Sequence, residues 1–129
     1  MNIQKFTQKS MQAVEGCEKL AYEYGNQEIE QEHLLYSLLK VEDSLILKLI
    51  EKMEIQKEHF VDRVEKAISK RTKVQGGKVY VGADLNKVLV NAEDEAKQLG
   101  DEYVSVEHLF LAMIKNPNRE LAQIWKEYG

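Results

Sequence analysis

The stretch "EQEHLLYSLLK", residues 30–40, returns 75 positions later as "SVEHLFLAMIK", residues 105–115. Both copies contain the run Glu-His-Leu and end in lysine. A neighbouring Glu and His can indicate metal or acid–base chemistry, whereas a repeated stretch can indicate one structural unit used twice. The rest of the sequence decides between these two interpretations.

The same spacing relates residues well outside the two stretches. It aligns Gly25 with Gly100 and Ala21 with Ala96, and apolar residues fall opposite one another at further positions: Ile29 and Val104, Leu35 and Phe110, Leu38 and Met113, Leu39 and Ile114. A shared phase over this many positions predicts a tandem duplication.

Each half begins with a segment whose apolar residues recur every three or four positions, as on one face of a helix. Thr7 can cap the start of the first segment and Gly25 its end, and Asp84 and Gly100 are the corresponding candidates in the second. The apolar positions are Phe6, Ala13, Val14, Cys17, Leu20, Ala21 and Tyr24, then Leu85, Val88, Leu89, Ala92, Ala96 and Leu99.

A short extended step follows each glycine and leads into a helix that carries the repeated stretch. Ser105 is a good N-cap for the second copy, and Glu107 lies in the first turn, where the helix dipole favours a negative charge. Glu30 takes the equivalent place in the first copy and is a poorer cap. Pro117 is expected to end the second helix.

A third helix is expected in each half, over residues 44–53 and 118–128, and a fourth over residues 56–70. Its twin would fall at about 131–145, beyond Gly129, so we expect a fragment of a longer protein that starts at the natural N-terminus. The sequence predicts an all-α fold of about seven helices with essentially no sheet. It forms one domain, 1–129: repeat one at about 6–70, a connector at 71–83 expected to be a mobile loop, and a shortened repeat two at about 84–129.

The charge balance limits the function. The chain has 18 basic and 22 acidic residues, and residues 71–83 alone carry a positive sum, of +3. A broad cationic face for nucleic acid is therefore not expected. The only cysteine, Cys17, excludes an intramolecular disulfide and agrees with a cytoplasmic location. No stretch approaches the ~18 apolar residues of a membrane span.

The repeated Glu-His pair does not form a catalytic pattern. Adjacent helical residues point about 100° apart, so Glu32 and His33 cannot face one ligand comfortably. The zinc-peptidase motif needs a second His four residues later, and neither copy supplies it. We therefore expect each His to bond a neighbouring segment from the first helical turn. Cys17 lies on an apolar stripe and is expected to be buried. The sequence indicates no catalytic residue, metal ligand or cofactor.

The residues "FT" at 6–7, "IEQEHLL" at 29–35 and "KVYVGADLNKVLVNAEDEAKQLGDEYVSVEHLFLA" at 78–112 resemble the double Clp N-domain of Clp/Hsp100 AAA+ unfoldases. The resemblance covers about Phe6 to Gly129 and is strongest to the ClpB branch. It implies a domain joined by a flexible linker to a homohexameric ATPase ring. Such a domain engages exposed apolar segments of misfolded or aggregated protein and is itself monomeric and not an enzyme, because ATP belongs to the ring modules.

The resemblance also implies the site. The residues in the relevant positions are Thr7, Asp101 and Glu107, beside an apolar groove that would include Leu89. His108 is also counted among the binding residues of this site, and both Asn91 and His108 are polar where some ClpB relatives have leucine. The alternative is the N-domain of a ClpC/ClpA-type unfoldase, whose surface docks adaptor proteins for a protease.

Overall fold

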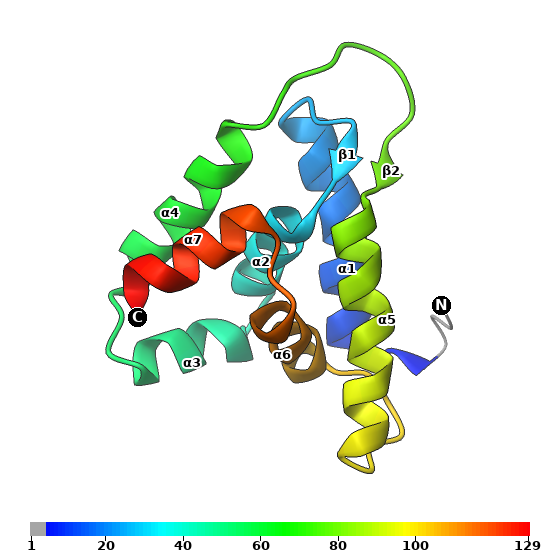
Figure 1. Cartoon of the computed structure of the whole chain (residues 1–129), viewed down its shortest axis with the longest axis vertical. Coiled ribbons are helices and arrows are strands. Elements are labelled where there is room, and N and C mark those ends of the chain that lie inside the picture. Colours follow the sequence, from blue (N-terminus) through cyan, green and yellow to red (C-terminus); the bar gives the residue numbers. More distant parts are fainter. Residues whose placement is uncertain (1–4) are drawn as a thin grey trace.

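The structure, a computed structural model, describes residues 5–129, and Figure 1 shows its helices arranged around α2. Seven helices are present in this range: α1 Gln8–Glu23, α2 Gln31–Lys40, α3 Leu45–Lys52, α4 Lys57–Ser69, α5 Ala83–Gln98, α6 Val106–Lys115 and α7 Arg119–Tyr128. The only strands in this range are β1, Glu28–Ile29, and β2, Tyr80–Val81. The predicted all-α fold of about seven helices is confirmed.

The duplication is visible in the bounds of the helices. The bounds of α1 and α2, shifted by 75 positions, coincide with those of α5 and α6, and α3 corresponds closely to α7. The residues after α1 and α5 turn at Gly25 and Gly100, with φ of 70° and 73°, in the left-handed region that glycine enters without strain. Within residues 5–129, α4 has no counterpart in the second unit.

The extended steps predicted after the two glycines are both paired. In the first unit, β1 runs parallel to β2, with Glu28 opposite Tyr80 and Ile29 opposite Val81. In the second, Val104 forms an isolated bridge with Phe6. The connector therefore contains a short strand in addition to the predicted loop. The β1–β2 pairing ties the first unit to the connector that leads into α5, and the Phe6–Val104 bridge ties the first unit to the second.

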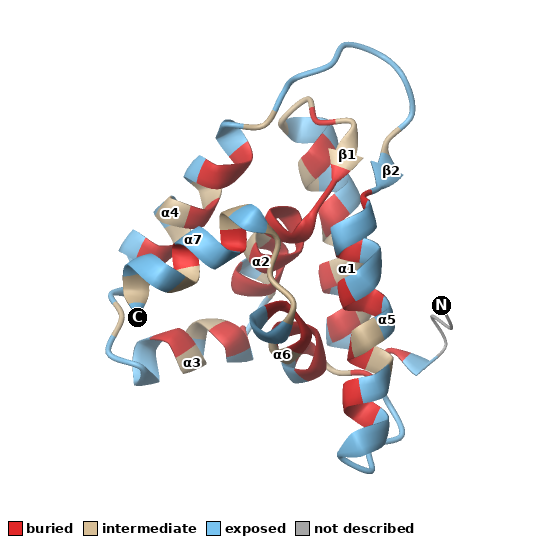
Figure 2. Ribbon diagram, in the orientation of Figure 1, coloured by how far each residue is buried: buried red, intermediate tan, exposed pale blue. Residues whose placement is uncertain are grey.

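One core serves both units, and α2 lies at its centre. This helix contacts each of the other six helices, so eight of its ten residues are buried, which leaves it almost no solvent face. Figure 2 shows the buried residues of α1, α5 and α6 turned towards the same interior. The core also includes Phe60, Leu109 and Ile124.

The predicted cap of α5 is wrong, because the cap comes from the other unit. The N-cap residue is Gly82, and Asp84 lies within the first helical turn. Glu30 Oε1 accepts the Leu85 backbone N–H at 2.8 Å and so satisfies one of the free donors at the helix start. A Cβ on residue 82 would lie 2.5 Å from the same oxygen. Glycine at position 82 is what allows this carboxylate to reach the helix.

Candidate functional site

An apolar groove lies where the starts of α1 and α6 meet the loop between α2 and α3. Its volume is about 310 Å³. Its lining, the Thr7–Glu107 groove below, consists of Thr7, Lys9, Leu38, Val41, Asp43, Leu45, Ile46, Ser105, Val106 and Glu107. The floor is aliphatic, and the polar members come from helix starts and a loop.

Capping and a backbone bridge bring the two helix starts together. Thr7 caps α1 by accepting the Ser10 N–H at 3.2 Å. The Thr7 N–H and the Ser10 hydroxyl both donate to the Val104 carbonyl oxygen, at 2.9 and 2.8 Å. Because Val104 immediately precedes Ser105, the N-cap of α6, these bonds fix the start of α1 beside the start of α6.

The loop between α2 and α3 forms the opposite wall of the groove. Asp43 adopts φ 53°, a left-handed conformation that aspartate tolerates better than most residues, and so turns the chain between Val41 and Leu45. Leu45 remains 40% exposed. The Lys9 ammonium donates to the Glu42 carbonyl oxygen and ties α1 to this loop. One edge of the groove is therefore an exposed leucine, Leu45, on a loop that a hydrogen bond holds against α1.

Asp101 and His108 lie behind the Ser105 edge of the groove. The backbone N–H of Ser105 donates to His108 Nδ1 at 2.9 Å, and His108 Nε2 lies 2.8 Å from Asp101 Oδ2. His108 is buried, while half of the Asp101 side chain is exposed. These two residues hold the start of α6 in place, whereas Thr7 and Glu107 lie on the groove itself.

Leu89 does not line this groove. It is buried in the core on the apolar face of α5, and contact with a ligand would require the helices to separate. Leu89 is buried because it belongs to the apolar stripe that α5 packs against α6.

Val41 and Leu45 line the groove, but the sequence did not identify them as groove residues. The only sequence signal for them was "VEDS", 41–44, a polar interruption between two apolar helices.

The histidines of both Glu-His pairs have the predicted structural role. His33 repeats the His108 arrangement: its Nδ1 accepts the Glu30 N–H at 2.9 Å, and its Nε2 bonds Asn26 Oδ1 at 2.9 Å. Because Nδ1 accepts in both, each ring carries its proton on Nε2. Burial lowers the pKa of His33 to about 4, so the ring is neutral at pH 7. Across residues 5–129, no three His, Cys, Asp or Glu side chains gather as a metal site would require.

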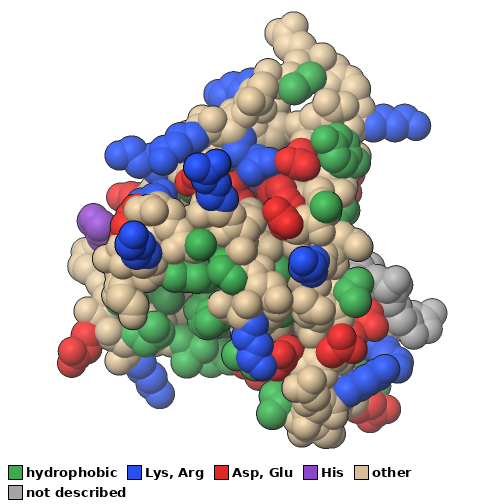
Figure 3. Space-filling view, viewed as in Figure 1, with side chains coloured by type: hydrophobic (Ala, Val, Ile, Leu, Met, Phe, Trp, Pro, Cys, Tyr) green, Lys and Arg blue, Asp and Glu red, His purple; other side chains and the backbone are tan. Residues whose placement is uncertain are grey.

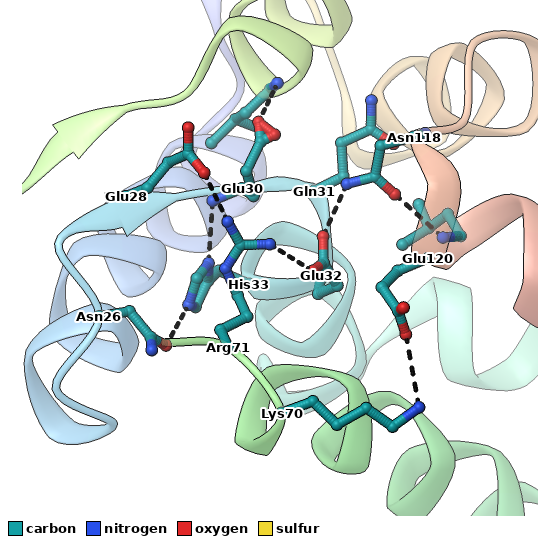
Figure 4. A network of polar contacts seen from close by, with 12 residues as sticks. Asn26, Glu28, Glu30, Gln31, Glu32, His33, Lys70, Arg71, Asn118 and Glu120 are labelled. Atoms are coloured by element: carbon teal, nitrogen blue, oxygen red, sulfur yellow. Dashed lines mark hydrogen bonds and ion pairs between the residues drawn. The ribbon is translucent and has the colours of Figure 1, made fainter. Parts of the chain in front are cut away.

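A second polar cluster joins the two units at the start of α2 (Figure 4). Arg71, from the connector, donates to buried Glu32 at 2.7 Å and to Glu28 at 2.5 Å. Asn118, the N-cap of α7, donates to the other Glu32 oxygen at 2.7 Å. The sequence showed Arg71 only as part of a basic connector, because its partners lie some forty residues away along the chain.

Glu30, at the same junction, uses only one of its two carboxylate oxygens in a hydrogen bond to another described residue. One carboxylate oxygen caps α5, and the other has no hydrogen-bond partner within the described part of the chain. Burial, opposed by the bond from Leu85, raises the pKa of Glu30 to about 7. Gln31 continues the junction by donating to the carbonyl oxygens of Asp84 and Asn116 at 3.1 and 3.0 Å. This cluster is a structural junction between the repeats.

Two copies of a helical unit around one core, with a groove where their ends meet, place the chain in the class of tandem helical-repeat domains. The family model "Clp repeat (R) N-terminal domain" matches residues 5–128, and the chain belongs to this family. The chain is 41% identical over 122 residues to the chaperone protein ClpB of Nitratidesulfovibrio vulgaris, a match covering 91% of this chain and 14% of the relative. It therefore spans about a seventh of that relative's length.

Solved structures share the fold. The N-terminal domain of Hsp104 from Candida albicans has a TM-score of 0.85 at 21% identity, covering 97% of this chain and 82% of that one. A ClpV N-domain in complex with a VipB peptide has a TM-score of 0.76 at 21% identity, covering 98% and 81%. No helix among residues 5–129 has the length and apolar character needed to cross a membrane.

Proposed function

We propose that this chain is the substrate-engaging N-terminal domain of a ClpB-type protein disaggregase. It binds exposed apolar segments of misfolded or aggregated proteins in the cytoplasm and passes them to the ATPase ring of its homohexameric parent. It acts by binding alone, since ATP hydrolysis belongs to the ring modules. The observation that carries the proposal is the Thr7–Glu107 groove, an aliphatic recess edged by polar groups.

The groove suits a weak and unselective peptide site. Val41 and Leu45, the partly buried and the exposed aliphatic residues of the lining, offer contacts without directional demands, so many apolar side chains can fit. Glu107 is exposed at the rim, where its charge can meet a cationic residue or a peptide N–H. A recess of about 310 Å³ accommodates only a few side chains, so we expect a dissociation constant in the micromolar range, about −8 kcal/mol or weaker.

The comparisons support a peptide as the ligand and favour the disaggregase branch. A ClpV N-domain of this fold carries a peptide, and the ClpB relative is 41% identical to this chain. Docking of an adaptor protein, as in the ClpC/ClpA-type alternative, would use a folded partner. Binding of unfolded segments would therefore indicate the disaggregase function, and binding of a folded protein would indicate the adaptor-docking function.

The test compares two exposed aliphatic side chains. Leu45 lines the groove and is 40% exposed, and Val90, on α5 outside it, is 46% exposed. Binding to fluorescently labelled, permanently unfolded lactalbumin is measured by anisotropy for Leu45→Lys, Val90→Lys and the unchanged chain. We expect the Leu45 variant to weaken binding about tenfold and the Val90 variant to leave it unchanged, both with native melting temperatures.

Rim residues are tested in the same assay. Glu107→Ala should weaken binding directly, and Asp101→Ala should act through the position of His108 and the start of α6. Equal binding by the Leu45 and Val90 variants, or losses fully explained by unfolding, would exclude this groove as the site. Tight binding of a folded adaptor with no affinity for unfolded protein would favour the alternative.

A further inference from the structure

The outer edge of β2 is a second place at which the chain can receive a partner. β2 pairs with β1 on one side, and within residues 5–129 no strand pairs with its other side. Figure 1 shows β2 at the border of the molecule beside β1, and Figure 3 shows hydrophobic and basic side chains at the surface over this region. We propose that this edge binds an extended, acidic segment of another polypeptide as an added strand.

The register of the two strands leaves backbone groups of β2 unused. The Tyr80 N–H donates to the Gln27 carbonyl oxygen at 2.9 Å. The Gly82 N–H donates to the Ile29 carbonyl oxygen at 2.8 Å. Because successive residues of a strand direct their backbone groups to opposite sides, the N–H and C=O of Val81 point away from β1. They form a donor and an acceptor with which an extended chain can pair.

The side chains of this edge define the chemistry of the added strand. Tyr80 is 52% exposed and Val81 is 48% exposed. Along an extended chain, Lys78 lies on the face of Tyr80, and Val79 lies on the face of Val81. Lys78 is exposed, and Val79 packs against the core. One face is therefore basic and aromatic and the other is aliphatic, so the best partner alternates acidic with aliphatic residues.

The charge of the connector favours an acidic partner over a second copy of this chain. Residues 71–83 sum to +3, although the whole chain has a net charge of −4. Glu28 of β1, the acidic residue opposite Tyr80, is already held by Arg71 at 2.5 Å. Pairing of two β2 edges would bring two basic connectors together, whereas an acidic segment would meet the opposite charge.

The test follows the backbone N–H of Val81 by NMR. The isotope-labelled chain is titrated with a capped peptide in which glutamate alternates with valine, Glu-Val-Glu-Val-Glu-Val-Glu. We expect a saturable shift of the Val81 amide signal. Its exchange with water should become at least about tenfold slower in the complex, because the N–H then donates to the peptide. The Tyr80 N–H already donates to Gln27, so its exchange should change less than about twofold.

Two control peptides separate backbone pairing from charge. One has a methyl group on every backbone nitrogen and cannot donate to a strand edge. The other has lysine in place of each glutamate. Each should bind at least about tenfold more weakly than the probe.

Matched variants locate the binding, which is measured for them by fluorescence anisotropy of the labelled probe. Val81→Pro removes the outward N–H at an edge position that proline can occupy, and Val81→Thr keeps it. Lys78→Glu reverses an exposed charge beside β2, and Lys48→Glu reverses one on α3, at the opposite end of the molecule in Figure 1. The first variant of each pair should weaken binding at least about threefold and the second less than about 1.5-fold, all with native melting temperatures.

Three results would overturn the proposal: no saturable shift, an unchanged exchange rate of the Val81 N–H in the complex, and equal binding of the methylated peptide. Leu45→Lys should leave the binding unchanged, because β2 shares no residue with the Thr7–Glu107 groove. A loss in that variant would place the peptide in the groove and refute the edge. A dimer in light scattering that Val81→Pro converts to monomer would assign the edge to a second copy of the chain and refute a separate partner.

Discussion

Glu30→Gln tests the junction between the two units through its pH dependence. The Glu30 side chain is 4% exposed, and burial raises its pKa to about 7 from the ordinary 4.5. A difference of about 2.5 pKa units at roughly 1.4 kcal/mol per unit corresponds to about 3 kcal/mol of folding free energy. Glutamine keeps an oxygen that can accept the Leu85 N–H but does not titrate.

The sign follows from which state holds the proton more tightly. Because the pKa is higher in the folded state, the folded protein binds the proton more strongly than the unfolded chain. This stabilisation is fully present below about pH 4.5 and is lost as the pH rises through 7. The free energy of unfolding of the wild type, relative to that of Glu30→Gln, should therefore fall by about 3 kcal/mol between pH 4.5 and pH 8.

The titration of His33 should make the loss of the Glu30 titration visible in the pH–stability profile of Glu30→Gln by itself. Burial lowers its pKa to about 4 from 6.5, so its contribution to stability is present above pH 6.5 and is lost as the pH falls through 4. Glu30 and His33 thus oppose each other between about pH 4.5 and 6.5, and the wild-type profile should be nearly flat there. Removing the Glu30 titration should expose the loss of stability in acid.

The measurement is urea unfolding followed by circular dichroism at a series of pH values from 4 to 8, on both proteins in parallel. Taking the difference removes every group that the two proteins share. A difference that stays constant across this range would show that Glu30 does not carry a raised pKa, and the account of a proton held at the junction would be wrong.

Two further substitutions test the packing of the units. Arg71→Ala leaves the fully buried Glu32 carboxylate without its cation and should cost about 3–5 kcal/mol in urea unfolding at pH 7; a loss under 1 kcal/mol would show that water replaces the guanidinium. Leu109→Ala truncates a fully buried side chain and should cost about 2–5 kcal/mol, measured in the same way, while a near-neutral result would contradict the shared core.

The fold could be predicted because both copies preserve the same apolar phase. Two helical stripes and two left-handed glycines recur at one spacing, and such local signals set helix bounds. The cap of α5 could not be predicted in this way. Asp84 has the right local chemistry, but Glu30 reaches the helix from 55 residues away, and no local propensity reports a contact of that kind.

The site was only partly predictable for the same reason. The resemblance named Thr7 and Glu107, and the structure places both on one groove. Leu89 fits a surface groove and a core stripe equally well in sequence, and only the packing of α5 places it in the core. The apolar wall from Val41 to Leu45 lies in a helix-to-helix loop, whose path depends on the tertiary contacts around it.

The duplicated Glu-His pair shows how one motif can serve two purposes. In both copies the histidine at the third helical position accepts the backbone N–H of the N-cap residue, so the histidine satisfies the helix start and leaves the adjacent glutamate available. In the first copy this glutamate, Glu32, is buried and held by Arg71 and Asn118. In the second copy, Glu107 is exposed on the rim of a groove. The first unit uses its carboxylate to join the repeats, and the equivalent carboxylate of the second unit lies at the surface because the histidine, not the glutamate, satisfies the helix start.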